Sequence, residues 1–477
     1  MINRQTARSS IKRIGTPTIA GLTLALIVSC AQQTPRDDSK PRDPLIQAAP
    51  SMNPQLIRDF ENKIVEALLA REAEAWHAQA SRTTLSKRED LRIQIHRLEQ
   101  LSERLEDVNQ AVLKESNKLA IKRHKYRLSR LKHELVETRL ATTDKTGSRL
   151  TGLLSHYTTR DQTAEFLLEQ ALGAIQKNNL EIRTLTMTLD DLAGEQNLYH
   201  ALTTNEALYL GNSDADKHLY LNLISDLLGS APSVFHKVLA VDTGTPIEVR
   251  AFPPSTDSEA QFVYVPANLV PANLSTKTPS ILQINLENMQ KHPLYEVEAK
   301  TYMHGIPGIH LVSTSRSSDS PLDTAVFTAT DVPAYTLGWG LYIASLAREY
   351  DLYQSRYGEL GSLILENRYA AILIVDLRLH QKTWTDQEAS HFLQKEGYMS
   401  LNEANSIIDR SRLLPISQTS AFAGLLAFKQ FRKEAQQRLG SRFDLVRFHR
   451  QLLSTGPLPF EFVEQELVAW LDKQAKK

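Results

Sequence analysis

The stretch that decides the fold of this chain reads Tyr302-Met303-His304-Gly305-Ile306-Pro307-Gly308-Ile309-His310-Leu311. Its two histidines are six residues apart, which suits neither one face of a helix nor the H-E-x-x-H spacing of two helical metal ligands. The Pro-Gly pair between them interrupts regular structure. Sequence with strand character precedes this stretch, and helical periodicity follows it.

Three short segments upstream of this stretch have the composition of β-strands. Residues 247–250 and 280–286 alternate between apolar and polar, and residues 261–265 are rich in strand formers. They predict a small sheet at about residues 246–286, inserted in a helical protein.

Upstream of the sheet, no proline occurs between Pro54 and Pro232, and no glycine between Pro54 and Gly147. Apolar residues recur every three or four positions, as on one face of a helix, at Leu91, Ile95, Leu98, Leu101, Leu105, Val108, Val112, Ile121, Leu128, Leu131 and Leu135. We predict long amphipathic helices that form either an antiparallel hairpin or a coiled-coil surface for a partner. The hairpin is the simpler interpretation.

Helical periodicity returns at Ala334 and is broken near Gly358, Gly397, Pro415, Gly440 and residues 456–459. The predicted fold is therefore mainly α, with long N-terminal helices packed on a helical body that carries a small sheet. The predicted divisions are a helical region at 54–230 and the body at 231–477.

Several sequence blocks in this body follow one another in a recognisable order. They are Met303–Leu311, Gly338-Trp339-Gly340-Leu341-Tyr342-Ile343-Ala344, Val375-Asp376-Leu377-Arg378-Leu379-His380, Leu439–Leu445, Phe448-His449 and Gly456-Pro457-Leu458-Pro459. Together they resemble the bacterial domain of unknown function 885, a largely helical family similar to zinc metallopeptidases, with the hallmark H-E-x-x-P-G-H-H-L-Q. The resemblance is clear from about Val234 onward and implies a metallopeptidase-like body.

The same resemblance implies where a zinc site would lie, and this chain departs from it there. Aligned on the Pro-Gly pair, the leading His falls on Met303, the Glu on His304 and the first following His on Ile309, which leaves only His310. The Glu of the family's G-W-x-L-Y-x-E falls on Ala344. A zinc hydrolase needs about three protein ligands and a carboxylate base, and a thioether is a poor zinc ligand. We therefore predict no catalytic residue, no bound metal and no cofactor.

Three interpretations of function remain open. The first is a non-catalytic binding or structural module on a decayed metallopeptidase-like scaffold, and the second is a divergent metal-dependent peptidase or hydrolase with zinc on His304 and His310. The third is a helical scaffold that binds a cell-envelope protein through residues 91–135. Asp376 and His380, at i and i+4, are either remnants that once oriented a ligand or an internal hydrogen-bonded pair.

The N-terminus has the pattern of an exported lipoprotein. Basic residues precede an apolar stretch that ends in Ile27-Val28-Ser29-Cys30, similar to the bacterial lipobox, and Cys30 is the only cysteine. We predict a signal peptide at 1–29, diacylglycerol attachment to Cys30 and a proline-rich tether at 30–53. Ala31 in place of an aspartate favours the periplasmic face of the outer membrane over the inner membrane.

The balance of charge argues against a nucleic-acid partner. The chain has 55 basic and 55 acidic residues, so it lacks the basic bias that binding to a phosphate backbone requires. The expected partners are the membrane, through Cys30, and a cell-envelope protein or peptide.

Overall fold

The computed structural model describes residues 55, 58–59, 61–68, 87–140, 147–195, 197–241, 245–253, 261–267, 278–314, 332–454 and 456–475. The chain divides into two compact units, Met1–Ile57 and Arg58–Lys477, and the elements below belong to the second. The predicted signal peptide, Cys30 and the tether at 30–53 lie outside the described residues.

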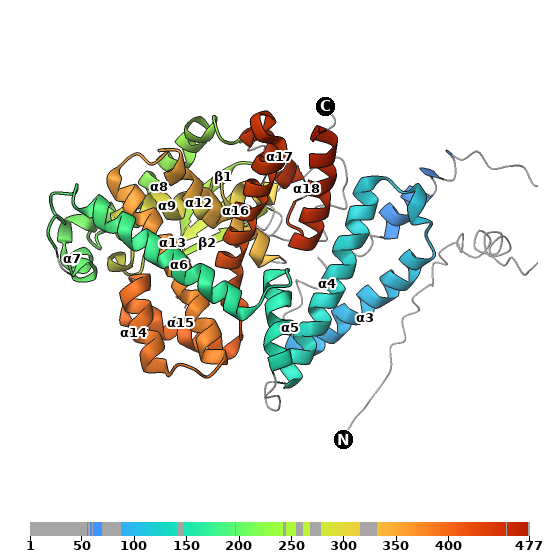
Figure 1. Cartoon of the computed structure of the whole chain (residues 1–477), viewed down its shortest axis with the longest axis horizontal. Helices are drawn as coiled ribbons and strands as arrows, with labels where there is room; N and C mark the ends of the chain where they lie inside the picture. The colour runs from blue at the N-terminus through green and yellow to red at the C-terminus, as the bar shows by residue number, and fades with distance from the viewer. Residues whose placement is uncertain are drawn as a thin grey trace, which may run out of the picture. The chain divides into compact units, whose positions relative to one another are not determined.

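Helices dominate the described part of the chain (Figure 1). The first group comprises α3 (Lys87–Glu106), α4 (Glu115–Leu140), α5 (Gly147–Thr158), α6 (Ala164–Thr186), α7 (Leu198–Thr204) and α8 (Asp214–Phe235). The second group comprises α9 (Leu294–His304), α10 (Ile309–Thr314), α12 (Pro333–Glu349), α13 (Arg356–His380), α14 (Asp386–Gly397), α15 (Leu401–Leu413), α16 (Ser420–Leu439), α17 (Leu445–Ser454) and α18 (Phe460–Ala475). The predicted fold class, mainly α with a small sheet, is confirmed.

Helices α3 and α4 form the predicted antiparallel hairpin. Their apolar faces pack on each other: Leu98 and Leu101 of α3 are buried, as are Ile121 and Leu128 of α4. The prediction of one continuous helical face as far as Val112 was wrong. Helix α3 ends at Glu106, and Val112 belongs to a separate 3-10 turn that the Asn109 side chain caps.

The predicted sheet is confirmed as three strands, β1 (Ile247–Ala251), β2 (Phe262–Val265) and β3 (Ser280–Ile284). The order is β1-β3-β2, with β3 central, parallel to β1 and antiparallel to β2. Leu282 and Ile284 of β3 are buried in the apolar core. The sheet thus packs into the helical body.

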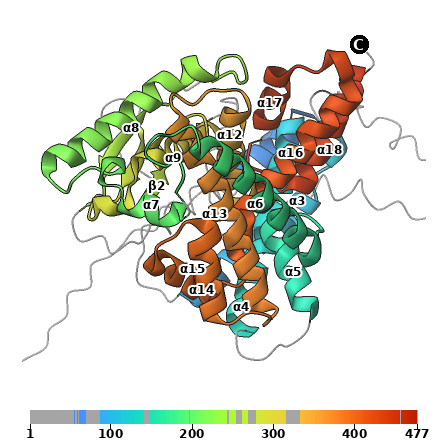
Figure 2. The same cartoon turned by 60° about the vertical axis from the view of Figure 1, so that its left-hand side comes forward.

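Helices α9, α12, α13 and α16 meet at the centre of the body, and α6 runs along α13 (Figures 1 and 2). Two glycines allow α12 and α16 to come into backbone contact. A Cβ atom on Gly338 would lie 2.5 Å from Cα of Gly424, and one on Gly424 would lie 1.9 Å from the Ala334 carbonyl oxygen. The core depends on this close crossing.

One apolar core contains residues from both predicted divisions of the chain. Leu167 and Leu227 of the first division belong to the same cluster as Trp339 and Phe428 of the second. The predicted boundary near residue 230 stays a prediction.

Within the described ranges, no helix combines the length and the apolar character needed to cross a membrane.

Candidate functional site

The decisive stretch forms a tight junction between α9 and α10. Helix α9 ends at His304, the Ile306–Pro307 peptide bond is cis, and α10 begins at Ile309. A Cβ on Gly308 would lie 2.0 Å from the Met303 carbonyl oxygen, so only glycine fits there. The Pro-Gly pair therefore folds the chain back on the end of α9.

Helix α12 packs against this junction and brings two of the sequence blocks together. The Trp339 indole donates a hydrogen bond to the Pro307 carbonyl oxygen at 3.0 Å. A Cβ on Gly340 would lie 2.6 Å from the Met303 carbonyl oxygen. The tryptophan and glycine of this block thus fix the position of α12 beside Met303.

The positions at which the resemblance implies ligands hold buried apolar side chains. Met303, Ile309 and Ala344 are at most 6% exposed, and Met303 and Ala344 belong to the main core cluster. The Ala344 carbonyl oxygen accepts hydrogen bonds from the hydroxyls of Tyr353 at 2.9 Å and Ser362 at 3.0 Å. This part of α12 is packed and hydrogen-bonded as a structural core.

Both ring nitrogens of His310 have hydrogen-bond partners within the protein. Its Nε2 lies 3.0 Å from the Thr245 carbonyl oxygen, and its Nδ1 lies 3.1 Å from the Tyr264 hydroxyl. Only a protonated nitrogen bonds to a carbonyl oxygen, so Nε2 is the donor and Nδ1 the acceptor of the neutral ring. Burial lowers the pKa of His310 to about 4. His310 therefore ties α10 to the sheet.

His304 lies at the end of α9 in a different environment. Its ring lies beside that of Phe262, with 5.8 Å between centroids, and is only partly buried. Burial and the nearby Lys300 ammonium lower its pKa to about 4. The ring is thus neutral at pH 7, beside a cation that would oppose a second positive charge.

Asp376 and His380 are neighbours, as their spacing predicts, with 3.4 Å between His380 Nε2 and Asp376 Oδ1. The closer contacts of both side chains are to backbone groups. Asp376 accepts hydrogen bonds from the amides of Ile416 and Gln418, both at 3.1 Å, and His380 Nε2 lies 2.8 Å from the Ser411 carbonyl oxygen. The pair connects α13 to the last turn of α15 and to the segment that follows it.

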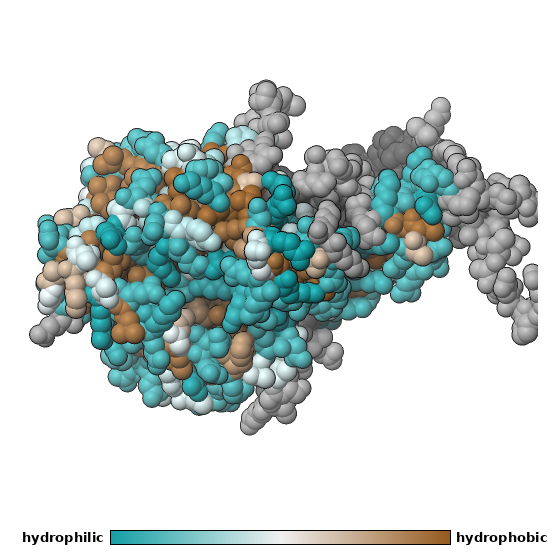
Figure 3. All heavy atoms as spheres, turned by 45° about the horizontal axis from the view of Figure 1, so that its top comes forward, coloured by the Kyte–Doolittle hydropathy of each residue, from teal (hydrophilic) through white to brown (hydrophobic). Residues whose placement is uncertain are grey.

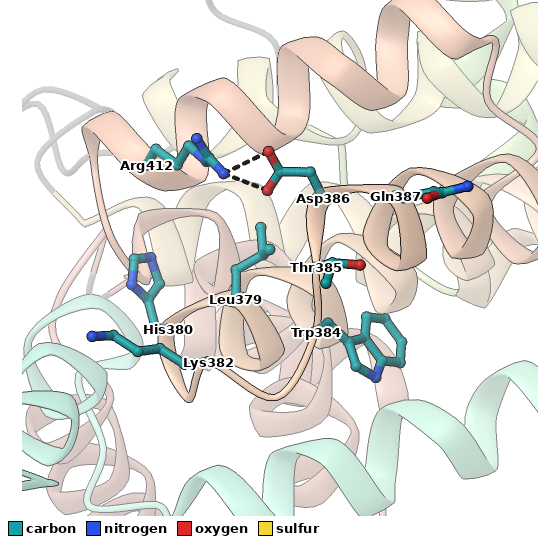
Figure 4. Close-up of a pocket in the computed structure, with 8 residues that line it drawn as sticks. All are labelled: Leu379, His380, Lys382, Trp384, Thr385, Asp386, Gln387 and Arg412. Atoms are coloured by element: carbon teal, nitrogen blue, oxygen red, sulfur yellow. Dashed lines mark hydrogen bonds and ion pairs between the residues drawn. The ribbon is translucent and has the colours of Figure 1, made fainter.

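A depression of about 510 Å³ lies next to His380 at the α13–α14 turn (Figure 4). It is lined by Leu379, His380, Lys382, Trp384, Thr385, Asp386, Gln387 and Arg412. The carboxylate of Asp386 is paired with the Arg412 guanidinium across it. Two of its charged side chains, Asp386 and Arg412, are therefore engaged with each other.

A buried charged cluster that was not predicted from the sequence is centred on Glu296 of α9. Glu296 accepts a bidentate hydrogen bond from Arg368, at 2.8 and 3.2 Å, and also pairs with Lys300. Lys300 donates to the Gln261 side chain, whose amide nitrogen donates to Glu403. Burial alone would raise the pKa of Glu296, but Arg368 and Lys300 outweigh it and hold this pKa below its usual value. The i, i+4 spacing of Glu296 and Lys300 is the one signal that could have indicated this cluster.

A second missed contact joins two of the sequence blocks. His449 Nε2 lies 2.8 Å from the Tyr342 hydroxyl, and His449 Nδ1 lies 2.7 Å from the Val238 carbonyl oxygen. Burial lowers the pKa of His449 to about 4. Like His310, this histidine is a neutral structural group.

Across the ranges that the structure describes, no three or more His, Cys, Asp or Glu side chains are grouped so that they could hold a metal ion. The residues at the expected ligand positions do not fit a zinc ion, since a methionine, an isoleucine and an alanine supply no donor that zinc prefers.

The protein is thus mainly helical, and a Pro-Gly pair forms the buried junction between α9 and α10. The model of the family described as bacterial protein of unknown function (DUF885) matches residues 46–467. The chain belongs to this family. No curated protein matches its sequence.

Two solved structures share the fold. One, described as a candidate lipoprotein from Colwellia psychrerythraea, is 20% identical with a TM-score of 0.62, and the match covers 80% of this chain and 66% of that one. The other, described as a candidate lipoprotein of unknown function from Shewanella oneidensis, is 16% identical with a TM-score of 0.57. That match covers 85% of this chain and 77% of the other one.

Proposed function

We propose that this protein is a lipid-anchored protein of the bacterial cell envelope whose metallopeptidase-like body is a non-catalytic binding or structural module. One observation carries the proposal. The positions at which the family resemblance implies metal ligands hold Met303, Ile309 and Ala344, which are buried and apolar, and the position of the carboxylate base holds His304.

The histidines that remain support the same conclusion. For His310 to bind zinc, the ring would have to give up its hydrogen bond to Thr245 or to Tyr264, and the donor or acceptor left behind would be buried without a partner. Such a loss costs about 1–3 kcal/mol. His304 lies beside Lys300, whose positive charge opposes a bound dication.

Metal analysis tests this proposal against the alternative of a divergent metallopeptidase on His304 and His310. Purified protein incubated with zinc and then passed through a desalting column is expected to retain far less than one zinc per chain, because too few donors converge. Elemental analysis measures the number of zinc ions per chain. When the protein is incubated with a mixed peptide pool, we expect no hydrolysis of the kind that a chelator suppresses.

The matched variants are His310→Ala and His449→Ala. Both histidines are fully buried and use both ring nitrogens, so the two substitutions damage the fold in a similar way. Stoichiometric zinc that is lost in His310→Ala but kept in His449→Ala would overturn the proposal.

The lipid anchor has support from the lipobox-like residues before Cys30 and from the description of both structural neighbours as candidate lipoproteins. Cells fed labelled palmitate are expected to label the wild-type protein and the Ser29→Ala variant, which keeps a small residue before the cut, but not Cys30→Ser. Label on Cys30→Ser, or none on the wild type, would refute the anchor. Separation of inner and outer membranes on a density gradient tests the proposed outer-membrane location.

A further inference from the structure

The outward face of α6 carries an exposed apolar stripe. The helix buries Leu167, Ala171, Ile175 and Ile182 on its inner face, while Phe166, Leu180 and Met187 are 41%, 65% and 75% exposed. Phe166, Gly173 and Leu180 recur every seven positions, so they lie on one face of the helix, and Met187, its C-cap residue, continues the spacing. On the face of the molecule drawn in Figure 3, hydrophobic residues reach the surface at several places among hydrophilic ones.

The middle of the stripe is hollow. A Cβ on Gly173 would meet no atom within 4 Å, and a depression of about 600 Å³ begins there, with Leu172, Phe422, Leu425 and Leu426 among its lining residues. A helix with a glycine at its crossing point allows another helix to approach closely. Exposed apolar side chains on both sides of such a point are typical of an interaction surface.

We propose that this surface binds the α6 helix of a second copy of the chain, with the two helices antiparallel and crossing at Gly173. The inference is independent of the proposed function. A two-fold axis at Gly173 places residues at equal spacing before and after it opposite each other. Phe166, seven residues before, then meets Leu180, seven residues after, in both halves of the interface.

Charge complementarity selects a second copy over an unrelated helix. Glu169 precedes Gly173 by four residues and Lys177 follows it by four, so each glutamate faces the lysine of the other copy. Both are exposed, and Lys177 also lies 3.6 Å from Glu181. The same axis brings Glu165 opposite Glu181, but Glu181 already faces Lys177 and Arg348 of its own chain.

A cysteine cross-link tests the geometry in the full-length protein. Gly173→Cys, in a Cys30→Ser background or with the lipidated Cys30 in place, should give a disulfide-linked homodimer under mild oxidation, because the two positions meet at the axis. Gly152→Cys is the control: it is also an exposed helical glycine with no atom near its Cβ position, and should stay monomeric. Equal cross-linking of both variants, or a cross-link only to a different protein, would overturn the proposal.

A charge exchange tests the pairing. In detergent solution, sedimentation should show a dimer whose dissociation constant rises about tenfold in Glu169→Lys and in Lys177→Glu, since each substitution places like charges together twice. The double exchange should restore the wild-type value. A monomeric wild-type protein, or a dimer whose dissociation constant changes in neither single variant, would refute the proposed interface. These exposed positions should leave the circular dichroism spectrum unchanged.

Discussion

Gly424→Ala is expected to lower the free energy of unfolding by at least about 3 kcal/mol, or to prevent folding altogether. The added Cβ would lie 1.9 Å from the Ala334 carbonyl oxygen and also against Gly338. Both obstacles are backbone atoms inside helix α12, so no side-chain rotation can relieve the overlap. The two helices would have to move apart and expose the surrounding core, which includes Trp339 and Phe428.

The matched control is Gly229→Ala in helix α8. That glycine is exposed and has no atom within 4 Å of its Cβ position, so alanine should stabilise the protein by up to about 1 kcal/mol through its higher helix propensity. Urea unfolding followed by circular dichroism measures both. A similar shift in both variants would contradict the close crossing of α12 and α16.

Acid should unfold this protein at a mild pH. Four histidines, His124, His292, His310 and His449, are at most 1% exposed, and burial lowers the pKa of each to about 4. Each has a ring nitrogen at a backbone carbonyl oxygen, which belongs respectively to Leu98, Asn285, Thr245 and Val238. Folding therefore requires the neutral form of all four.

The sign follows from proton binding. Because the folded pKa lies below the usual 6.5 of histidine, the unfolded chain binds more protons between pH 6.5 and 4. The stability that these residues contribute is fully present above about pH 6.5 and is lost as the pH falls towards 4. These four groups together contribute up to about 5 kcal/mol per pH unit to the slope.

Denaturant unfolding at pH 7.5, 6.5, 5.5 and 4.5 measures this slope. His449→Gln should reduce the slope by about 1.4 kcal/mol per pH unit while lowering stability at pH 7.5, whereas the exposed His218→Gln should alter neither. A free energy of unfolding that stays constant from pH 6.5 to 4.5 would refute the prediction.

Local pattern was enough to predict most of the elements. The breaks at Gly397, Pro415 and Gly440 fall at the ends of α14, α15 and α16, because proline and glycine disfavour a helix wherever the chain folds. The parallel pairing of β1 with β3 could not be predicted, since it joins Ile247 to Ser280 across a long intervening segment. Alternation identifies a strand but not its partner.

The candidate site, too, could be predicted only in part from the sequence. The apolar character of positions 303, 309 and 344 can be read directly from the sequence, and the i, i+4 spacing of Asp376 and His380 predicted their contact. The hydrogen-bond partners of His310 could not be predicted, because Thr245 and Tyr264 come from the sheet region. Nor could the bidentate pairing of Arg368 with Glu296, which joins α13 to α9.

The packing around Ala344 also limits how a metal site could arise on this scaffold. A glutamate at this position would place a carboxylate among core side chains, beside a carbonyl oxygen already bonded to Tyr353 and Ser362. An uncompensated buried charge costs several kcal/mol. The protein would lose this stability before a histidine at position 303 could help to bind a metal. Each single substitution toward a ligand set would thus give a less stable protein, so a metal site is hard to build here one substitution at a time.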